Sequence, residues 1–184
     1  QIYYAFEEND FCSLQCYGNQ RGFVIHIVDN FGLVLFIGLK RCAIPGSCCA
    51  HQVTVEAPPG NVIGTVNQRV SYCFPDYEIN DHNGEPVLNI SSPEFGTIFC
   101  GWGDKKFAVK SMDDLEVGSI HKQWSGLLQE LLTDADNFGV SFPLDLSVRV
   151  KATLIGATFL IDFVHFETSA SAQRRRFREI RYNL

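Results

Sequence analysis

Short segments in which apolar and polar residues alternate recur along most of the chain, a pattern typical of β-strands with one buried face. Residues 23–28 alternate in this way and lead, through a turn at 29–32, to an apolar segment at 33–39. Further segments of this kind occupy residues 52–55, 62–66, 77–80, 87–90, 95–100 and 107–110. Asn83-Gly84 stands between two of them and is a strong hairpin signal, because both central residues of a tight hairpin turn need positive φ. We therefore predict an antiparallel β-barrel or sandwich built from consecutive hairpins.

Two segments depart from this pattern and predict helices. In residues 124–132, four leucines fall at helical spacing. Residues 152–166 are apolar on every side of a helix except at Asp162 and His165, and such a helix must be buried in a protein core or in a bilayer. A helix of this length extends about 22 Å, which is less than the roughly 30 Å thickness of a hydrocarbon layer.

The second helix fits a protein core better than a membrane span, although the sequence leaves both open. Asp162 would cost roughly 2.5–3.5 kcal/mol at the centre of a membrane. A β-barrel needs an apolar filling, and this helix needs burial on all sides. We therefore predict a mostly β fold, an antiparallel β-barrel around a buried apolar C-terminal helix. The residues assigned to this buried or membrane helix are Ile155, Gly156, Phe159, Leu160, Asp162 and Phe163.

Composition and charge narrow the class of protein. The chain has 184 residues, of which 46% are hydrophobic, enough for one domain with a sizeable core. It begins at Gln1 without a signal-peptide pattern, so we expect a fragment of a longer protein. The net charge is −6, but the last eleven residues hold five Arg and one Glu. The acidic body makes nucleic acid unlikely as the main partner. The basic tail fits either contact with anionic lipid or simple solvation.

The seven cysteines are odd in number and irregularly spaced, which favours a reducing compartment over a disulfide framework. Cys42, Cys48, Cys49 and His51 stand close together, but adjacent cysteines do not easily point at one ion, so we consider a zinc site unlikely. Cys48 and Cys49 fit two interpretations. They are either carriers of palmitoyl groups, since two chains anchor far better than one, or unmodified thiols of a loop.

Residues 134–145 resemble a calcium-binding loop. Asp134, Asp136, Gly139 and Asp145 fall at positions 1, 3, 6 and 12 of the EF-hand template. Phenylalanines fill positions 5 and 9, where oxygen ligands are expected, and Asp145 replaces the usual bidentate Glu. Two interpretations stay open: a weak Ca²⁺ site with affinity toward the millimolar range, or an Asp-capped turn between a helix and a strand.

The sequence holds no recognisable catalytic constellation. It has no P-loop, no G-x-G-x-x-G and no nucleophile elbow, and its five His are scattered without ligand spacing. We therefore expect a protein that is not an enzyme.

Several motifs together resemble the phospholipid scramblase family. The most specific are Thr133-Asp-Ala-Asp-Asn-Phe-Gly139, Phe142-Pro-Leu-Asp145, Ile155-Gly-Ala, Phe159-Leu-Ile-Asp-Phe163 and Phe166-Glu167. Upstream motifs that agree in order include Tyr3-Tyr4-Ala5, Cys48-Cys49, Ala57-Pro58-Pro59-Gly60, Gly118-Ser-Ile and Trp124-Ser-Gly126. The likeness extends over nearly the whole chain to Glu167.

This resemblance implies a domain organisation, a fold and a set of sites. It implies a tubby-like domain at residues 1–167, whose first strands normally precede Gln1, followed by a basic tail at 168–184. It implies a closed antiparallel barrel around a central apolar helix. It also places a calcium loop at residues 134–145, a palmitoylated cluster at 42–49 and a proposed membrane span in the region of 152–166.

Two functions follow as hypotheses. The resemblance implies a phospholipid scramblase, a transporter-like protein at the cytosolic face of the plasma membrane. It would move phospholipids between leaflets in both directions, with Ca²⁺ and without ATP. The alternative is a tubby-like module that binds membrane lipid or protein partners and moves no lipid, located in the cytoplasm or nucleus if it is not lipidated. The five Arg of the tail favour the alternative, because the positive-inside tendency opposes their transfer across a membrane.

Overall fold

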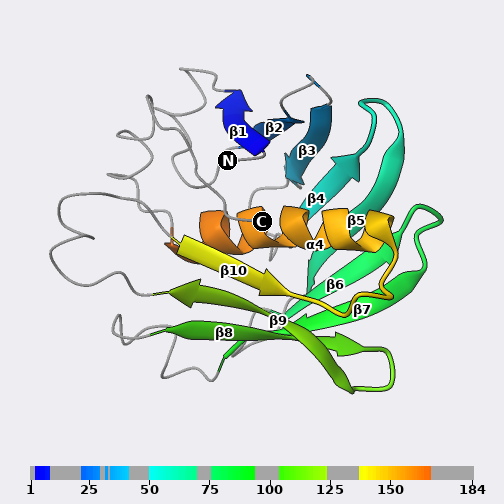
Figure 1. Cartoon of the computed structure of the whole chain (residues 1–184), viewed down its shortest axis with the longest axis vertical. Coiled ribbons are helices and arrows are strands. Elements are labelled where there is room, and N and C mark those ends of the chain that lie inside the picture. The colour runs from blue at the N-terminus through cyan, green and yellow to red at the C-terminus, as the bar shows by residue number, and fades with distance from the viewer. Residues whose placement is uncertain are drawn as a thin grey trace, which may run out of the picture.

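The computed structural model describes residues 3–8, 22–29, 32, 34–41, 50–69, 76–93, 104–123 and 137–166 (Figure 1). Within these residues, ten strands form one antiparallel sheet in which each strand pairs with the next along the chain. The strands are β1 (Tyr3–Glu8), β2 (Val24–Asp29), β3 (Val34–Arg41), β4 (His51–Glu56), β5 (Val62–Arg69), β6 (Asp76–Asp81), β7 (Pro86–Ser91), β8 (Lys105–Ser111), β9 (Glu116–Gln123) and β10 (Asn137–Ser141).

The alternating pattern predicted most of these strands correctly. Strands β2 to β8 each coincide with a predicted segment to within a few residues. Along β4, β6 and β7, the buried residues alternate with more exposed ones, as a sheet with one inner face requires. The predicted strand at 95–100 and the predicted helix at 124–132 lie outside the described residues. Strands β1, β9 and β10 were not predicted.

One helix follows the sheet and lies in its concave face (Figure 1). Helix α4 (Val148–Ile161) begins after Ser147, whose Oγ accepts a hydrogen bond from the Val150 backbone N–H at 3.3 Å, as an N-cap does. A five-residue π-helix, η2 (Asp162–Phe166), continues it without a break. The prediction placed the start of this helix four residues too late, because Arg149 and Lys151 interrupt the apolar residues in the first turn of α4.

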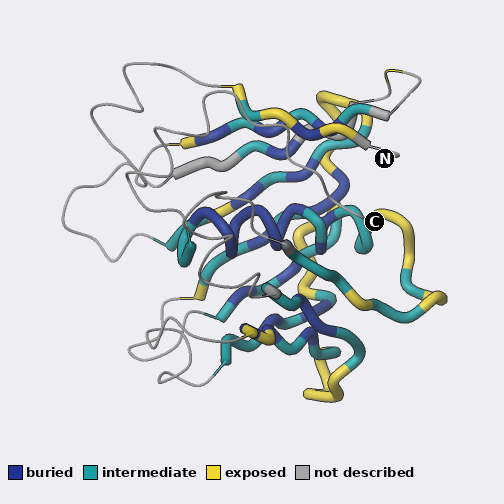
Figure 2. Tube along the Cα trace, turned by 60° about the vertical axis from the view of Figure 1, so that its left-hand side comes forward, coloured by how far each residue is buried: buried dark blue, intermediate teal, exposed yellow. Residues whose placement is uncertain are grey.

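Helix α4 forms the centre of the hydrophobic core. Leu154, Ala157, Leu160 and Ile161 are fully buried, and they join a cluster that includes inner-face residues of the strands. Buried residues run along the helix and through the strands that curve around it (Figure 2). The sheet is not closed within the described residues, since β1 and β10 are its two edges. The predicted mostly β fold around a buried apolar helix is thus confirmed, and it is consistent with a tubby-like barrel.

The residues assigned to the buried or membrane helix lie in the hydrophobic core or pack against it. Gly156, Phe159, Leu160, Asp162 and Phe163 are buried. Ile155 is half-buried and packs against the same core. Across the described parts of the chain, no helix has both the length and the apolar character needed to cross a membrane.

Candidate functional site

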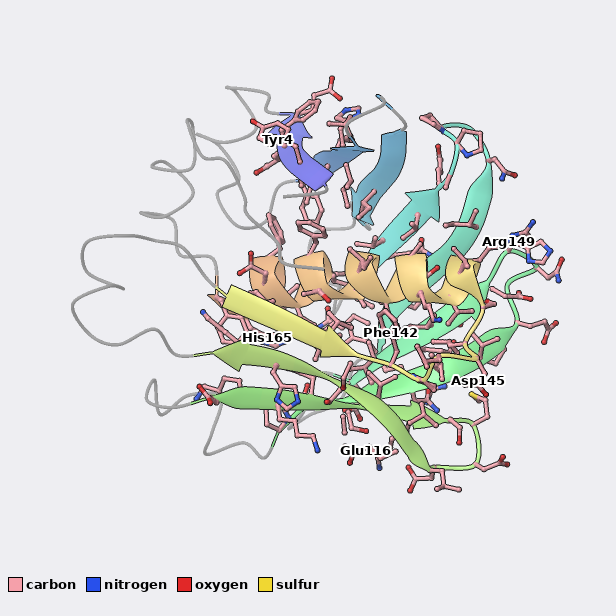
Figure 3. The ribbon with its side chains drawn as sticks, in the orientation of Figure 1. Tyr4, Glu116, Phe142, Asp145, Arg149 and His165 are labelled. Carbon is pink, nitrogen blue, oxygen red and sulfur yellow. The ribbon has the colours of Figure 1, made fainter. Side chains whose placement is uncertain are left out.

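The predicted calcium and lipidation residues fall mostly in segments that the structure does not describe. Asp134, Asp136, Cys48 and Cys49 lie outside the described residues. Asp145 is described, and it is exposed in the turn that connects β10 to α4 (Figure 3). Binding of Ca²⁺ and attachment of palmitoyl groups therefore stay predictions.

The described part of the predicted calcium loop has an extended conformation. Positions 4 to 8 of the template are strand β10, which pairs with β9 from Asn137↔Gln123 to Ser141↔Ser119. A strand rises about 3.3 Å per residue, so the two ends of β10 stand about 13 Å apart. Asp145 follows the far end of β10, whereas Asp134 and Asp136 lie outside the described residues, so the binding of one Ca²⁺ by these three carboxylates stays a prediction.

The connection from β10 to α4 is a capped turn of another kind. Ser147 caps α4, whereas the alternative of an Asp-capped turn between a helix and the following strand concerns residues before β10 that lie outside the described residues. Lys151 Nζ donates a hydrogen bond to the Leu144 backbone oxygen at 2.7 Å and lies 5.3 Å from the centre of the Phe142 ring. In the described part of the chain, no three His, Cys, Asp or Glu side chains gather into a group that could hold a metal ion.

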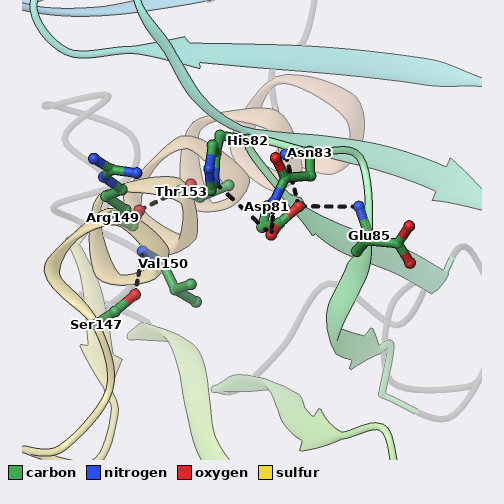
Figure 4. A network of polar contacts seen from close by, with 8 residues as sticks. All are labelled: Asp81, His82, Asn83, Glu85, Ser147, Arg149, Val150 and Thr153. Atoms are coloured by element: carbon green, nitrogen blue, oxygen red, sulfur yellow. Dashed lines mark hydrogen bonds and ion pairs between the residues drawn. The ribbon is translucent and has the colours of Figure 1, made fainter.

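At the helix N-terminal end, the turn between β6 and β7 lies beside α4 (Figure 4). Asp81 Oδ1 accepts hydrogen bonds from the backbone N–H groups of Asn83 at 2.8 Å and Glu85 at 3.0 Å. The hydrogen bond from Glu85 is the main reason why the pKa of Asp81 is lowered, with Asn83 and the nearby His82 adding to the effect. On the helix, Thr153 Oγ1 donates to the Arg149 backbone oxygen at 2.9 Å. These contacts close a turn and the first helical turn, and we assign them a structural role.

At the opposite end, a pair of polar side chains, one buried and one half-buried, joins the helix to the sheet. Tyr77 of β6 is fully buried, and its Oη lies 2.7 Å from Nε2 of His165 in η2. Burial, with a smaller contribution from the nearby His51, lowers the pKa of His165 to about 4. Burial also raises the pKa of Tyr77, with a smaller contribution from Asp76. Both side chains are therefore neutral near pH 7, and their hydrogen bond satisfies two polar groups inside the core.

Aromatic side chains surround this pair. The rings of Phe107 and His165 have centroids 5.9 Å apart, and those of Phe107 and Phe166 lie 6.4 Å apart in an edge-to-face arrangement. Phe138 of β10 reaches the same place, 5.9 Å from Phe166. Sequence reasoning singled out His165 as a polar residue in an apolar segment, but it did not find Tyr77. The two are 88 residues apart, and neither belongs to a motif.

Comparisons with known proteins agree on one family. The family model described as Scramblase matches residues 1–168. The chain is 43% identical to phospholipid scramblase 1 of Homo sapiens over 182 residues, which cover 95% of this chain and 56% of that protein. It is 44% identical to phospholipid scramblase 2 of Bos taurus over 175 residues, 91% of this chain and 58% of that protein. The chain thus spans about half the length of these curated relatives. No solved structure matches it at a significant level.

Proposed function

This chain belongs to the scramblase family, and we propose that it takes part in moving phospholipids between the two leaflets of a membrane. The match over residues 1–168 carries this proposal, together with the relatives named phospholipid scramblase. Because the chain spans about half the length of those relatives, the activity is proposed for the whole protein to which this chain corresponds.

The finer features of the family are part of the same proposal. They are dependence on Ca²⁺, independence of ATP, movement in both directions, and a location at the cytosolic face of the plasma membrane with palmitoyl groups on Cys48 and Cys49. Since Asp134 and Asp136 lie outside the described residues, we assign no step of lipid movement to the ion. Membrane phospholipids are the proposed substrates. Protein partners belong to the binding-module hypothesis.

A second candidate function has one specific observation in its favour. The helix that the resemblance assigns to a membrane span is buried in the core of this fold, with Leu154, Ala157 and Leu160 fully enclosed. A helix enclosed by its own sheet is not available to contact acyl chains. This favours a module that binds lipid or protein at the cytosolic face of a membrane and moves no lipid itself.

Reconstitution into vesicles separates the two candidates. The whole protein to which this chain corresponds is incorporated into vesicles that carry a fluorescently labelled phospholipid in both leaflets, and the label of the outer leaflet is then reduced chemically. A scramblase makes nearly all of the label accessible without ATP, whereas protein-free vesicles leave about half protected. If that protein floats with the vesicles but leaves the label protected, the binding module replaces the scramblase. Heat-unfolded protein in the same vesicles is the control for leakage.

An epitope after Leu184 tests the membrane span itself. If α4 stays in the core, the epitope is detected by antibody only after the plasma membrane is permeabilised. Detection on intact cells would contradict the burial of α4 in the membrane-bound protein. An epitope on a known cytosolic protein in the same cells is the control for membrane integrity.

A further inference from the structure

Large apolar side chains are exposed at one end of the sheet. Successive strands run in opposite directions, so the β4–β5, β6–β7 and β8–β9 turns and the connection from β10 to α4 all lie at this end (Figure 1). Single exposed apolar residues are ordinary, but several at one end of a fold indicate a contact surface. Among the described residues, seven large hydrophobic side chains are exposed, and five of them belong to this end: Val62, Met112, Leu115, Leu144 and Val148.

The two most exposed of these side chains belong to the connection from β10 to α4. Leu144 is 95% exposed, and Val148, the first residue of α4, is 80% exposed. Between them, Leu146 packs against the core. Lys151 Nζ donates a hydrogen bond to the Leu144 backbone oxygen at 2.7 Å. The fold thus holds the backbone of this connection in place and leaves two apolar side chains in water, where they add nothing to the core.

The charges of this connection indicate its partner. Residues 142–151 hold two cations, Arg149 and Lys151, against one anion, Asp145. Arg149 is exposed, and its guanidinium group lies away from Asp81 (Figure 4). The N-terminal end of α4 is the positive end of the helix dipole, and its first turn contains no acidic residue. Apolar side chains beside positive charge fit the interface of a bilayer, where the first enter the acyl region and the second attract anionic headgroups.

The β8–β9 turn at the same end has a different charge. Met112 and Leu115 are exposed there, but Asp113 and Asp114 stand between them and are exposed as well. Lys110 forms an ion pair with Asp114 at 2.8 Å, so the negative charge of Asp113 remains. An anionic membrane repels this turn. The apolar character is shared by the two connections, whereas the positive charge belongs to the connection from β10 to α4.

We propose that the connection from β10 to α4 is a membrane-contact surface. Leu144 and Val148 enter the interface of a bilayer that contains anionic phospholipid, and Arg149 contacts its phosphate groups. Only the start of α4 takes part, so the rest of the helix stays in the core. This inference rests on the proposed function in one respect, namely that the protein works at a membrane. It requires no movement of lipid, so the contact and the movement are measured separately and either can fail alone.

Quenching of an introduced tryptophan tests the contact at a chosen position. Leu144→Trp and Leu115→Trp each place an indole at an exposed position at this end of the sheet. The whole protein to which this chain corresponds is produced in bacteria, so that no palmitoyl group holds it at a membrane. It is added to vesicles of phosphatidylcholine and phosphatidylserine with brominated acyl chains, which quench indoles that they contact. The same protein without the new tryptophan gives the background emission.

We expect the added emission of Leu144→Trp to be quenched and to shift to shorter wavelength, and that of Leu115→Trp to stay nearly unchanged. Equal quenching at the two positions overturns the assignment to the connection from β10 to α4. Absence of quenching in Leu144→Trp overturns the proposal, whether or not the protein binds the vesicles, because another part of the chain would then hold it there.

Flotation with the same lipids, without bromine, measures the affinity of polar variants. The double variant Leu144→Asn with Val148→Asn should bind about tenfold or more weakly, because two apolar side chains are lost from the bound state. Met112→Asn with Leu115→Asn is the matched control and should bind as the wild type does. Equal affinities of the two double variants contradict the proposal.

Arg149→Gln tests the role of the headgroup charge. It should weaken binding about fivefold on vesicles with phosphatidylserine, the contribution of one Arg near an anionic surface. On vesicles of phosphatidylcholine alone it should have no effect. The same loss on both kinds of vesicle, or no loss on either, overturns the assigned contact between Arg149 and phosphate.

Two further measurements protect the interpretation. Because Leu144 and Val148 are exposed, the double variant should unfold at the wild-type temperature in circular dichroism. If it does not fold, the quenching of Leu144→Trp still decides the proposal. Sedimentation equilibrium without lipid examines another occupant, a second copy of the chain. A wild-type dimer that the Leu144 and Val148 substitutions convert to monomers would assign the surface to that copy and overturn the membrane contact.

Discussion

Gly156 of α4 lies so close to Val55 of β4 that a Cβ atom in its place would stand 2.6 Å from Val55 Cγ2. Val53 and Ile37 side chains stand next to it, at 3.7 and 3.9 Å from the same position. The backbone of α4 therefore packs directly against side chains of the sheet at this point. The absence of a side chain on Gly156 sets how closely the helix approaches the sheet.

We expect Gly156→Ala to destabilise the fold by about 1–3 kcal/mol, the usual cost of overpacking a filled core. This overpacking cost should exceed the gain of about 1 kcal/mol that alanine brings to a helix interior, so the net change in the free energy of unfolding is a loss. Urea denaturation measures the difference. Gly139→Ala in β10 is the matched control, since nothing lies within 4 Å of a Cβ atom there. Relief of the loss by Val55→Ala in the double variant would confirm the contact, and simple additivity would contradict it.

The Tyr77–His165 pair predicts a loss of stability in mild acid. The pKa of His165 is lowered in the folded state to about 4, from an ordinary value of 6.5. The unfolded chain therefore takes up a proton before the folded chain does. Stability is complete above about pH 6.5 and falls as the pH decreases toward about 4, by up to about 3 kcal/mol from this group.

Chemical denaturation at a series of pH values measures this loss. His165→Gln removes the titrating group, so we expect its stability to change less between pH 6.5 and 4 than that of the wild type. His82→Gln, at an exposed position, is the matched control. The same pH dependence in the wild type and in His165→Gln would mean that other groups cause the acid sensitivity.

Strand β10 predicts unequal roles for the acidic residues of the calcium motif. If Ca²⁺ stimulates lipid movement in the vesicle assay, we expect Asp134→Asn and Asp136→Asn to weaken the response and Asp145→Asn to leave it unchanged. The reason is that Asp145 follows the end of β10, whereas Asp134 and Asp136 precede its start in the sequence, so a Ca²⁺ site around those two residues need not include Asp145. An equal loss in all three variants would contradict the expectation that Asp145 plays a lesser role.

We expect the N-cap residue Ser147 to make a modest contribution to the stability of the fold. Ser147→Ala removes the side-chain acceptor of the Val150 N–H, and we expect a loss of about 1 kcal/mol. Ser147→Asp keeps an acceptor at this position and should retain the stability. Thermal unfolding followed by circular dichroism compares the three proteins. Similar unfolding temperatures for wild type and Ser147→Ala would show that water satisfies this N–H group equally well.

Where a strand alternates cleanly, its place in the fold could be predicted from the sequence. Strand β9 was missed because its inner face carries Lys122 beside Ile120, while its outer face holds the hydrogen-bonded Ser119 and His121. Strand β10 was missed because its inner residues, Phe138 and Val140, lie within a run that also fits the calcium template. In both cases a local pattern competed with pairing to a neighbouring strand, and the pairing prevailed.

The core helix could be predicted from composition, whereas the contacts at its ends could not. An all-round apolar segment must be buried wherever it occurs, so its environment follows from its own residues. The pairing of Tyr77 with His165 depends on register between strands and on the end of the helix. No spacing along the chain encodes such distances.

The order of elements along the chain has a consequence for biosynthesis. Each strand pairs with the next, so the sheet can grow hairpin by hairpin as the chain leaves the ribosome. The helix that covers its concave face is made after all ten of these strands. The side chains of Ile37, Val53 and Val55 surround Gly156 in the folded protein, and they lack this contact until α4 packs against the sheet. A nascent chain that stops before Val148 therefore displays an apolar sheet to water, and such chains are substrates for chaperones and sources of aggregation.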